Sequence, residues 1–412
     1  PENCSNGSDD DGDGRIDCFD TDCYLQPKCG RVPATEHWIN NYDGSLFLIA
    51  DDVAVDADGS IYVCMSAFQF GGGDTSEDTV LLKLDGEGEL LWQASFTEPG
   101  ANWYCSLGLT GDSRLFSAQT KNSDGEGVTL YEVDPETGNT LEQRTTLVGD
   151  SSISKIIFEG DSLYFVGTVF RQGTHSYLAR FRLAGGDAEL VWYDEQETQQ
   201  AIRDLTSIPG GAIFTFTDGY VPDTLLPDRQ EKAIWGRRHD AQLNLINEFA
   251  IDGPQSDFVE AAEALPDGSV YVVAYYSGEE VGSFGAYVVM KISPSTNIEW
   301  VTPFPVDTAY IRHIPLMVHH QGHLYVTYTT MREDFKSFED TEVRVDKYEL
   351  QGNLLGSATL ASAPSKGWDF IKSFTIDEQG TWYLLGEGYG DFSGSDIDKK
   401  HPWLIKMANP LP

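Results

Sequence analysis

The sequence predicts an all-β protein: a seven-bladed β-propeller closed by an N-terminal strand and preceded by a short disulfide-rich calcium-binding segment. Three observations support this prediction. Hairpin signals recur seven times along the chain, the strands at its two ends complement each other, and the first thirty residues are rich in Cys and Asp.

Each repeat contains a turn rich in Gly or Asp, followed by a β-branched and aromatic run such as "DADGSIYVCMSA" or "LPDGSVYVVAY". Such turns between strand-forming runs are a strong hairpin signal. The turn positions lie 49 to 58 residues apart, at Gly59, Asp112, Asp161, Gly211, Gly268, Gly322 and Gly380. This regular period predicts a repeat architecture.

A third and a fourth strand complete each repeat, with one exception. Seven third strands can be identified, from "TVLLKLD" to "PWLIKMA", but only six fourth strands follow them. The segment "TEHWINNYD", with Trp38, supplies the missing strand from the other end of the chain. Residues 36–43 are therefore expected to close the ring, which removes exposed sheet edges.

These patterns divide the chain into a Cys/Asp-rich segment, residues 1–30, and a propeller, residues 31–412. The blades are expected at about 46–97, 104–147, 152–196, 201–251, 257–305, 310–360 and 368–408 plus 36–43. The direction of the closing strand places residues 30–35 on the face of the hairpin turns, opposite the long loops between second and third strands.

The first thirty residues contain too little apolar surface to fold unaided and need covalent or metal staples. Four cysteines lie there, and their even number favours two disulfides of undetermined pairing over a zinc site, since histidines and CxxC pairs are absent. Disulfides imply an oxidising, extracellular location. The four are Cys4, Cys18, Cys23 and Cys29.

The acids of this segment have the spacing of a calcium loop. Carboxylates fall at positions 1, 3, 5, 9 and 12 and a glycine at position 6. With one backbone carbonyl from the segment that follows the glycine, they would supply the oxygens that Ca²⁺ requires. A solvated acidic linker is the alternative. The expected ligands are Asp9, Asp11, Asp13, Ile16, Asp17 and Asp20.

The string "ENCSNGSDDDGDGRIDCFDTDC" resembles a thrombospondin type-3 calcium repeat and the metal-binding motif of secreted and surface proteins of some bacteria. That resemblance implies a structural calcium site in an extracellular setting. The segments "LDGEGELLWQ" and "VDPETGNTLEQ" resemble repeats of pyrroloquinoline-quinone-type and related bacterial propellers. The second resemblance implies a fold only. The quinone-binding enzymes have eight blades and an adjacent cysteine pair over the cofactor, whereas this chain has seven predicted blades and no adjacent cysteines.

The net negative charge of the chain argues against nucleic acid and anionic membranes as partners. The chain of 412 residues has a formal net charge of −39, which opposes the phosphate contacts of a nucleic-acid-binding protein and attraction to anionic lipid. No apolar run is long enough to span a membrane. We therefore expect no nucleic-acid partner and no membrane insertion.

The first strand of each blade is expected to line the central channel, and the starts of these seven strands are expected to meet at its mouth. Their mixed charges suit a polar ligand, although pairing with one another is the simpler interpretation. A carboxylate pair such as Asp204 and Glu260 would also suit acid–base hydrolysis. The candidates are Asp51, Asp52, Tyr104, Ser154, Arg203, Asp204, Glu260, Arg312, His313, Lys372 and Ser373.

Two smaller features have structural and functional interpretations. Cys64 and Cys105 form either a disulfide between neighbouring blades or two buried thiols. His319, His320 and His323 surround one turn, where they are either exposed turn residues or ligands of a transition metal.

These observations predict a secreted or cell-surface calcium-binding propeller that acts as a protein- or glycan-binding or assembly module. Calcium is the expected cofactor, and the expected partner is an unidentified surface protein or glycan. The alternatives are an extracellular hydrolase or lyase acting on a polar polymer, and a subunit of a larger surface filament or complex.

Overall fold

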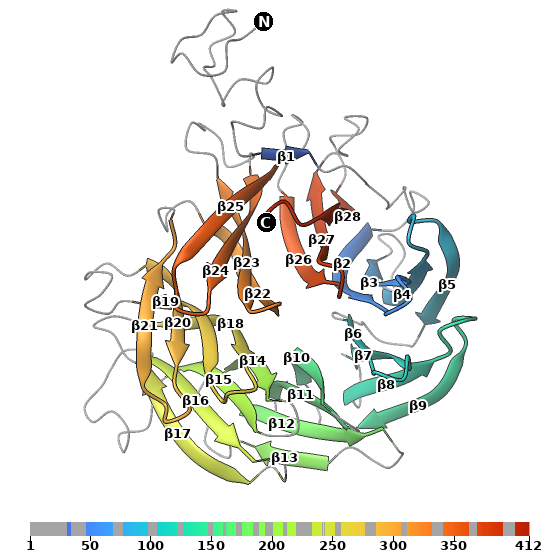
Figure 1. The fold of residues 1–412 in the computed structure, drawn as a ribbon. Coiled ribbons are helices and arrows are strands. Elements are labelled where there is room, and N and C mark those ends of the chain that lie inside the picture. The colour runs from blue at the N-terminus through green and yellow to red at the C-terminus, as the bar shows by residue number, and fades with distance from the viewer. Residues whose placement is uncertain are drawn as a thin grey trace, which may run out of the picture. The chain divides into compact units, whose positions relative to one another are not determined.

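The computed structural model contains 28 β-strands and no helix among the residues that it describes (Figure 1). Those residues are 31–33, 47–68, 77–97, 105–121, 127–146, 151–159, 162–169, 175–183, 189–193, 201–208, 212–219, 233–240, 242, 244–251, 257–276, 286–305, 311–331, 341–361, 369–389 and 400–411. Within them, no helix is long and apolar enough to cross a membrane. The all-β prediction is confirmed.

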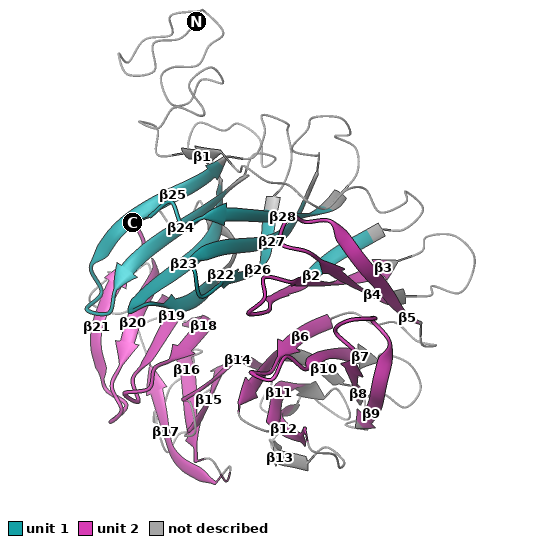
Figure 2. Ribbon diagram, turned by 45° about the vertical axis from the view of Figure 1, so that its right-hand side comes forward, with its two compact units in different colours: residues 1–50, 309–412 teal, residues 51–308 magenta. Residues whose placement is uncertain are grey.

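The strands form seven consecutive sheets, as the seven hairpin signals predicted. Two compact units divide them, residues 51–308 and residues 1–50 with 309–412 (Figure 2). The first two sheets contain β2 (Phe47–Val55), β3 (Ile61–Phe68), β4 (Glu77–Leu84) and β5 (Leu90–Thr97), and β6 (Cys105–Leu109), β7 (Leu115–Lys121), β8 (Gly127–Val133) and β9 (Thr140–Thr146).

Three further sheets complete the unit of residues 51–308, and each is a simple antiparallel meander. The third contains β10 (Ser151–Glu159), β11 (Ser162–Val169), β12 (His175–Arg182) and β13 (Glu189–Tyr193). The fourth contains β14 (Ala201–Ser207), β15 (Ile213–Gly219), β16 (Ala233–His239) and β17 (Leu245–Ile251). The fifth contains β18 (Phe258–Ala264), β19 (Val270–Tyr276), β20 (Ala286–Ile292) and β21 (Ile298–Pro303).

The other unit holds the last two sheets and one strand that the sequence pattern did not indicate. The sixth sheet contains β22 (Ile311–His320), β23 (His323–Met331), β24 (Thr341–Glu349), β25 (Leu354–Ala361) and, beyond β25, β1 (Arg31–Pro33). The seventh contains β26 (Asp369–Ile376), β27 (Thr381–Tyr389) and β28 (Lys400–Ala408). The expected closing strand, residues 36–43, lies outside the described residues.

The position of β1 corrects one expectation. β1 pairs in parallel with β25 and its register joins Arg31 to Thr359 and Pro33 to Ala361. The C-terminal end of β25 lies at the end of the sheet where β23 ends and β24 begins, because neighbouring strands run antiparallel. Residues 31–33 pair with the last residues of β25 and so lie at that end, and not at the end of the hairpin turn between β22 and β23.

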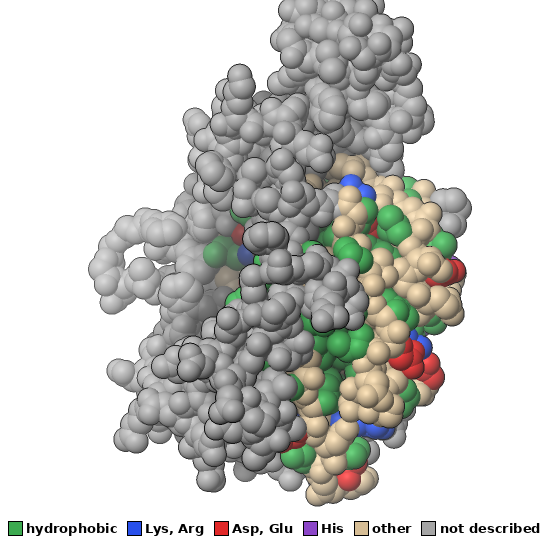
Figure 3. All heavy atoms as spheres, turned by 90° about the vertical axis from the view of Figure 1, so that its left-hand side faces the viewer, with side chains coloured by type: hydrophobic (Ala, Val, Ile, Leu, Met, Phe, Trp, Pro, Cys, Tyr) green, Lys and Arg blue, Asp and Glu red, His purple; other side chains and the backbone are tan. Residues whose placement is uncertain are grey.

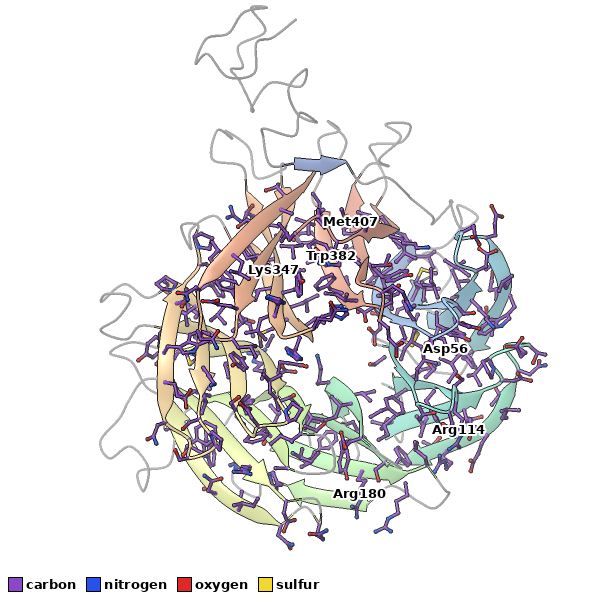
Figure 4. All side chains as sticks on the ribbon, viewed as in Figure 1. Asp56, Arg114, Arg180, Lys347, Trp382 and Met407 are labelled. Carbon is purple, nitrogen blue, oxygen red and sulfur yellow. A yellow bond between two sulfur atoms is a disulfide. The ribbon has the colours of Figure 1, made fainter. Side chains whose placement is uncertain are left out.

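Within each unit, the core lies between consecutive sheets. Phe116 and Phe165, from the second and third sheets, belong to one buried cluster, and Tyr62 and Leu107 join the first sheet to the second in another. In the unit of residues 1–50 and 309–412, Trp382 and Met407 lie in the cluster between the sixth and seventh sheets (Figure 4). Period-two alternation places these side chains on the faces that meet.

A cation on the third strand pairs with an aromatic residue on the second strand in most sheets. The Lys83 amine lies 5.6 Å from the centroid of the Tyr62 ring and the Lys291 amine 5.9 Å from that of Tyr271. Direct cross-strand neighbours bring such side chains together. The register gives the pairs Tyr62–Lys83, Tyr164–Arg180, Phe214–Arg238, Tyr271–Lys291, Tyr325–Lys347 and Tyr383–Lys406.

The described turns follow the predicted chemistry with one difference, and the predicted turn residues Asp161 and Gly211 lie outside the described residues. Gly59, Gly268 and Gly380 adopt positive φ angles of 84°, 87° and 86°, which glycine accommodates without a steric penalty. In the second repeat the left-handed residue is Ser113, with φ 61°, and not Asp112. Asp112 instead accepts a hydrogen bond from the Thr110 hydroxyl, so its carboxylate stabilises the turn.

Candidate functional site on the first strands

The first strands of four neighbouring sheets, β6, β10, β14 and β18, lie next to one another in the unit of residues 51–308. A β-bulge interrupts three of these strands: the register skips Ser154 in β10, Arg203 in β14 and Glu260 in β18. A bulge adds one residue to a strand and changes the direction of its side chain. Two charged candidates from the sequence, Arg203 and Glu260, therefore occupy the same structural position in neighbouring sheets.

The unit of residues 1–50 and 309–412 repeats this feature. The register skips Arg312 in β22 and Lys372 in β26. The Lys372 amine lies 3.1 Å from Glu387 Oε1, and the Glu387 side chain is only 3% exposed. Lys372 thus pairs with a buried carboxylate of its own sheet. Ser373 resumes the register after this bulge, opposite Leu385.

Asp52 has a structural role. Its carboxylate accepts hydrogen bonds from the Leu107 backbone N–H at 2.9 Å and from the Ser106 hydroxyl at 3.0 Å. Both donors belong to β6, the first strand of the next sheet. Charge-assisted bonds of this kind join the first sheet to the second. The preceding Asp51 is buried and accepts a hydrogen bond from the Ser66 hydroxyl at 2.6 Å.

Asp204 makes the equivalent contact between the fourth and fifth sheets. Its carboxylate accepts a hydrogen bond from the backbone N–H of Ala262 in β18. Two residues further along β14, the Thr206 hydroxyl oxygen accepts one from the Ala264 N–H at 2.9 Å. The carboxylate that the sequence offered for acid–base chemistry therefore holds two first strands together.

Lys155 and Glu263, which the sequence patterns did not single out, complete a group that we call the first-strand cluster: Lys155, Asp204 and Glu263. The Lys155 amine lies 3.6 Å from Asp204 Oδ1, with the Lys155 side chain 43% exposed and that of Asp204 3% exposed. Asp204 raises the pKa of Lys155. Burial raises the pKa of Asp204, and Lys155 opposes this effect.

Glu263 titrates near neutrality. Burial raises its pKa to about 7; Lys155 lowers that pKa, and Asp204 raises it further. A carboxyl group with this pKa suits proton transfer at physiological pH. A signal for Lys155 and Glu263 did exist in the sequence, since both lie in first strands, but bulges shift the register by one residue and hide which side chains converge.

Glu260 lies beside an aromatic hydroxyl. Burial raises the pKa of Tyr287 to about 12, and the charge and hydrogen bond of Glu260 contribute to the increase. Glu260 and Asp204 thus have different partners, Tyr287 and Lys155, among the described contacts. This arrangement gives no support to a direct Asp204–Glu260 acid–base pair.

Several predicted residues lie where the structure gives no side-chain description. Tyr104 and the whole calcium segment, including Asp9, Asp11, Asp13, Ile16, Asp17, Asp20 and Cys4, Cys18, Cys23 and Cys29, lie outside the described residues. Arg312 and His313 are placed by backbone pairing alone, as is Ser154 at the bulge of β10.

Cys64 and Cys105 form a disulfide, which decides between the two possibilities that the sequence left open. Their Cα atoms are 6.1 Å apart, and both side chains are fully buried. The bond joins β3 of the first sheet to β6 of the second. Ser117 lies beside it, with its hydroxyl oxygen 3.2 Å from Cys105 Sγ.

The histidine turn gives no support to the metal hypothesis. His320 and His323 are cross-strand partners, whereas His319 pairs with Leu324 and so lies on the other face of the sheet. In the part of the chain that the structure describes, no group of three or more His, Cys, Asp or Glu side chains is placed to hold a metal ion. Burial lowers the pKa of His319.

We expect Asp204→Ala to destabilise the fold by about 2–3 kcal/mol, because the Ala262 N–H loses its acceptor and Lys155 its ion-pair partner. Denaturant unfolding measures the loss. Asp204→Asn, which keeps an oxygen for the N–H, should lose less. Equal stability of wild type and Asp204→Ala would contradict the structural role.

Glu263→Gln should stabilise the protein at pH 8 by about 2 kcal/mol more than at pH 5. The folded-state pKa, about 7, exceeds the ordinary value of 4.5, so the unfolded chain releases this proton first. Stability is therefore lost as pH rises from about 4.5 to 7. Thermal unfolding at both pH values tests this expectation, with the same substitution at the exposed turn residue Glu87 as the matched control.

Comparison with known proteins supports the fold. No protein-family model matches the sequence, and no curated protein matches it. Among solved structures, the β-propeller domain of the Trilobed protease from Pyrococcus furiosus, described as having an open velcro topology, matches with a TM-score of 0.51 and 9% sequence identity. The match covers 88% of this chain and 95% of that chain. The chain has the fold of a seven-bladed β-propeller.

Proposed function

We propose that this protein is an extracellular or cell-surface binding and assembly module, in which the propeller is a rigid scaffold and residues 1–30 form a calcium-binding segment. One observation carries the proposal: the carboxylates that could serve as catalytic acids or bases are instead engaged in hydrogen bonds that hold neighbouring sheets together. Asp52 and Asp204 accept hydrogen bonds from the next sheet. A scaffold of this kind presents binding loops at fixed positions.

The disulfide supports the proposed location. Buried disulfides persist in oxidising compartments and are rare in the reducing cytosol, and Cys64–Cys105 is buried between two sheets. The resemblance of residues 2–23 to extracellular calcium repeats points to the same compartment. An acidic surface, with a net charge of −39, favours solubility there and a partner that carries positive charge.

The calcium part has its own test. Calorimetric titration of the full chain with Ca²⁺ should show a site that Asp11→Ala removes, and chelation should raise protease sensitivity only near residues 1–35. The same heat of binding in wild type and Asp11→Ala would remove calcium from the proposal without affecting the propeller.

The binding role is tested by incubating the full chain with a glycan array and with extracellular proteins. A binding module retains an unmodified ligand, in a saturable manner. Release of a shortened or eliminated product would instead identify an enzyme.

A second candidate, an extracellular hydrolase or lyase acting on a polar polymer, is favoured by one observation. Glu263 has a pKa of about 7 and lies near the Lys155 ammonium group, as a general acid or base would. If a polymer is cleaved, Glu263→Gln should abolish turnover while binding remains. Unchanged turnover in that variant would exclude this residue as the acid or base.

A further inference from the structure

The fourth strands of the sheets differ in charge. β9, β13, β17 and β21 contain Glu142, Glu189, Glu248 and Glu299, respectively. β5, "LLWQASFT", and β25, "LLGSATLA", contain no charged residue. Charged side chains on an edge strand are one means by which proteins prevent pairing with other chains. β5 and β25 lack that protection.

The edge of β25 is occupied by β1, an extended segment of the same chain. Three residue pairs join them in parallel, Arg31 to Thr359 through Pro33 to Ala361. β1 begins with an arginine and contains no acid. The chain therefore provides one example of strand addition: β1, a short segment with a positively charged residue, pairs with a fourth strand that contains no charged residue. In the described part of the first sheet, β5 is the last strand.

The start of β5 combines apolar and acidic groups at the surface. Leu90 and Leu91 are 55% and 54% exposed, and Leu91 is the residue that the register with β4 skips. The turn before them carries Glu87 and Glu89, both exposed. Asp85 Oδ1 accepts hydrogen bonds from the backbone N–H groups of Glu87 and Glu89, which fixes the turn and leaves their carboxylates in solvent.

Exposed apolar residues occur at the same point in other sheets, for example Leu245 and Ile246 at the start of β17. Figure 3 shows the side of the molecule with β17 and β21, where hydrophobic side chains reach the surface. There, however, the strand continues with Glu248, which forms an ion pair with Arg237. Only β5 combines the apolar start, a charge-free strand and an edge without a partner in the described residues.

Side chains of β5 pack against the second sheet and hold the strand in its extended conformation. Trp92 Nε1 donates a hydrogen bond to the Pro135 carbonyl oxygen of the second sheet at 3.0 Å. The Phe96 ring packs 4.7 Å, centroid to centroid, from that of Tyr131. A pre-ordered strand pays little conformational entropy when a second strand is added.

We propose that the edge of β5 binds an extended, positively charged segment of a partner protein by strand addition. Main-chain hydrogen bonds would supply affinity, with Leu90 and Leu91 contacting apolar side chains and Glu87 and Glu89 attracting the cationic ones. A second copy of the chain is disfavoured, since each copy carries a charge of −39. This inference rests on the proposed binding function and names the chemistry of one partner.

The probe is a nine-residue peptide of alternating valine and lysine, compared with the same peptide methylated on every backbone nitrogen. Both carry equal charge, but only the first can donate main-chain hydrogen bonds. The unmethylated peptide should bind the full chain at least about ten-fold more tightly, and it should slow amide hydrogen exchange in residues 90–97. Equal binding of the two peptides, or protection confined to other strands, would overturn the proposal.

Matched variants test the charge component. Glu87→Lys should weaken binding of the valine–lysine peptide about three- to ten-fold, whereas Glu378→Lys, at an exposed turn in the other unit, should leave it unchanged. Equal weakening by both would reveal attraction to the whole acidic surface and overturn the proposal. A dimer that is seen in size-exclusion chromatography and that Gln93→Lys dissociates would also overturn the proposal, because a second copy of the chain would then occupy the edge of β5. A glycan or protein partner that binds wild type and the β5 variants equally well would support the proposed binding function and contradict only the proposal of strand addition at β5.

Discussion

Replacing Asp346 by alanine should destabilise the protein by about 3–5 kcal/mol, because a buried carboxylate and its partners are separated. The Asp346 side chain is fully buried. Its Oδ2 accepts a hydrogen bond from the Tyr328 hydroxyl at 2.6 Å, and Oδ1 accepts one from Arg344 Nε at 3.0 Å. Burial raises the pKa of Tyr328, and the charge of Asp346 raises it further, so the hydroxyl remains a donor throughout the physiological range.

The measurement is denaturant unfolding of Asp346→Ala, Tyr328→Phe and the double variant. Tyr328→Phe removes one donor and should cost about 1 kcal/mol. Because the two residues interact directly, the double variant should lose less than the sum of the single losses. Additive losses would show that the Tyr328–Asp346 hydrogen bond contributes nothing to stability.

The second large effect concerns the Cys64–Cys105 disulfide. Its cysteines are 41 residues apart in sequence, and closing a loop of that length in the unfolded chain stabilises the folded state by about 4 kcal/mol. The double variant Cys64→Ala/Cys105→Ala should therefore unfold at a clearly lower denaturant concentration. Both sulfur atoms are buried between sheets, so a cavity adds to the loss.

Reductant provides the control for this prediction. Wild-type protein should lose a similar amount of stability in a strong thiol reductant, whereas the double variant should lose much less on the same treatment. A variant as stable as wild type in the absence of reductant would contradict the stabilising role.

The repeat could be predicted from sequence because its signals are local. A turn residue such as Gly59 or Gly268 and the aromatic strand that follows are adjacent in the chain, so periodicity locates seven sheets. The partners of the polar residues are not local. Asp204 meets Ala262 across 58 residues, at a distance set by sheet packing.

Bulges explain why the candidate site was predicted only in part. Arg203 and Glu260 were identified as residues at strand starts, but the sequence did not indicate that both occupy bulges. The shift also brings Lys155, one position after Ser154, to Asp204. β1 was missed for another reason: three residues, Arg31–Pro33, are too short to show alternation.

The disulfide between β3 and β6 has a practical consequence for proteolysis. A single cut at any bond between Cys64 and Cys105 would leave the two pieces of chain covalently joined. Such nicked protein would migrate near its full mass of 45.6 kDa on a denaturing gel run without reductant. Addition of reductant would resolve it into two bands, so paired lanes would reveal cleavage that a single lane conceals.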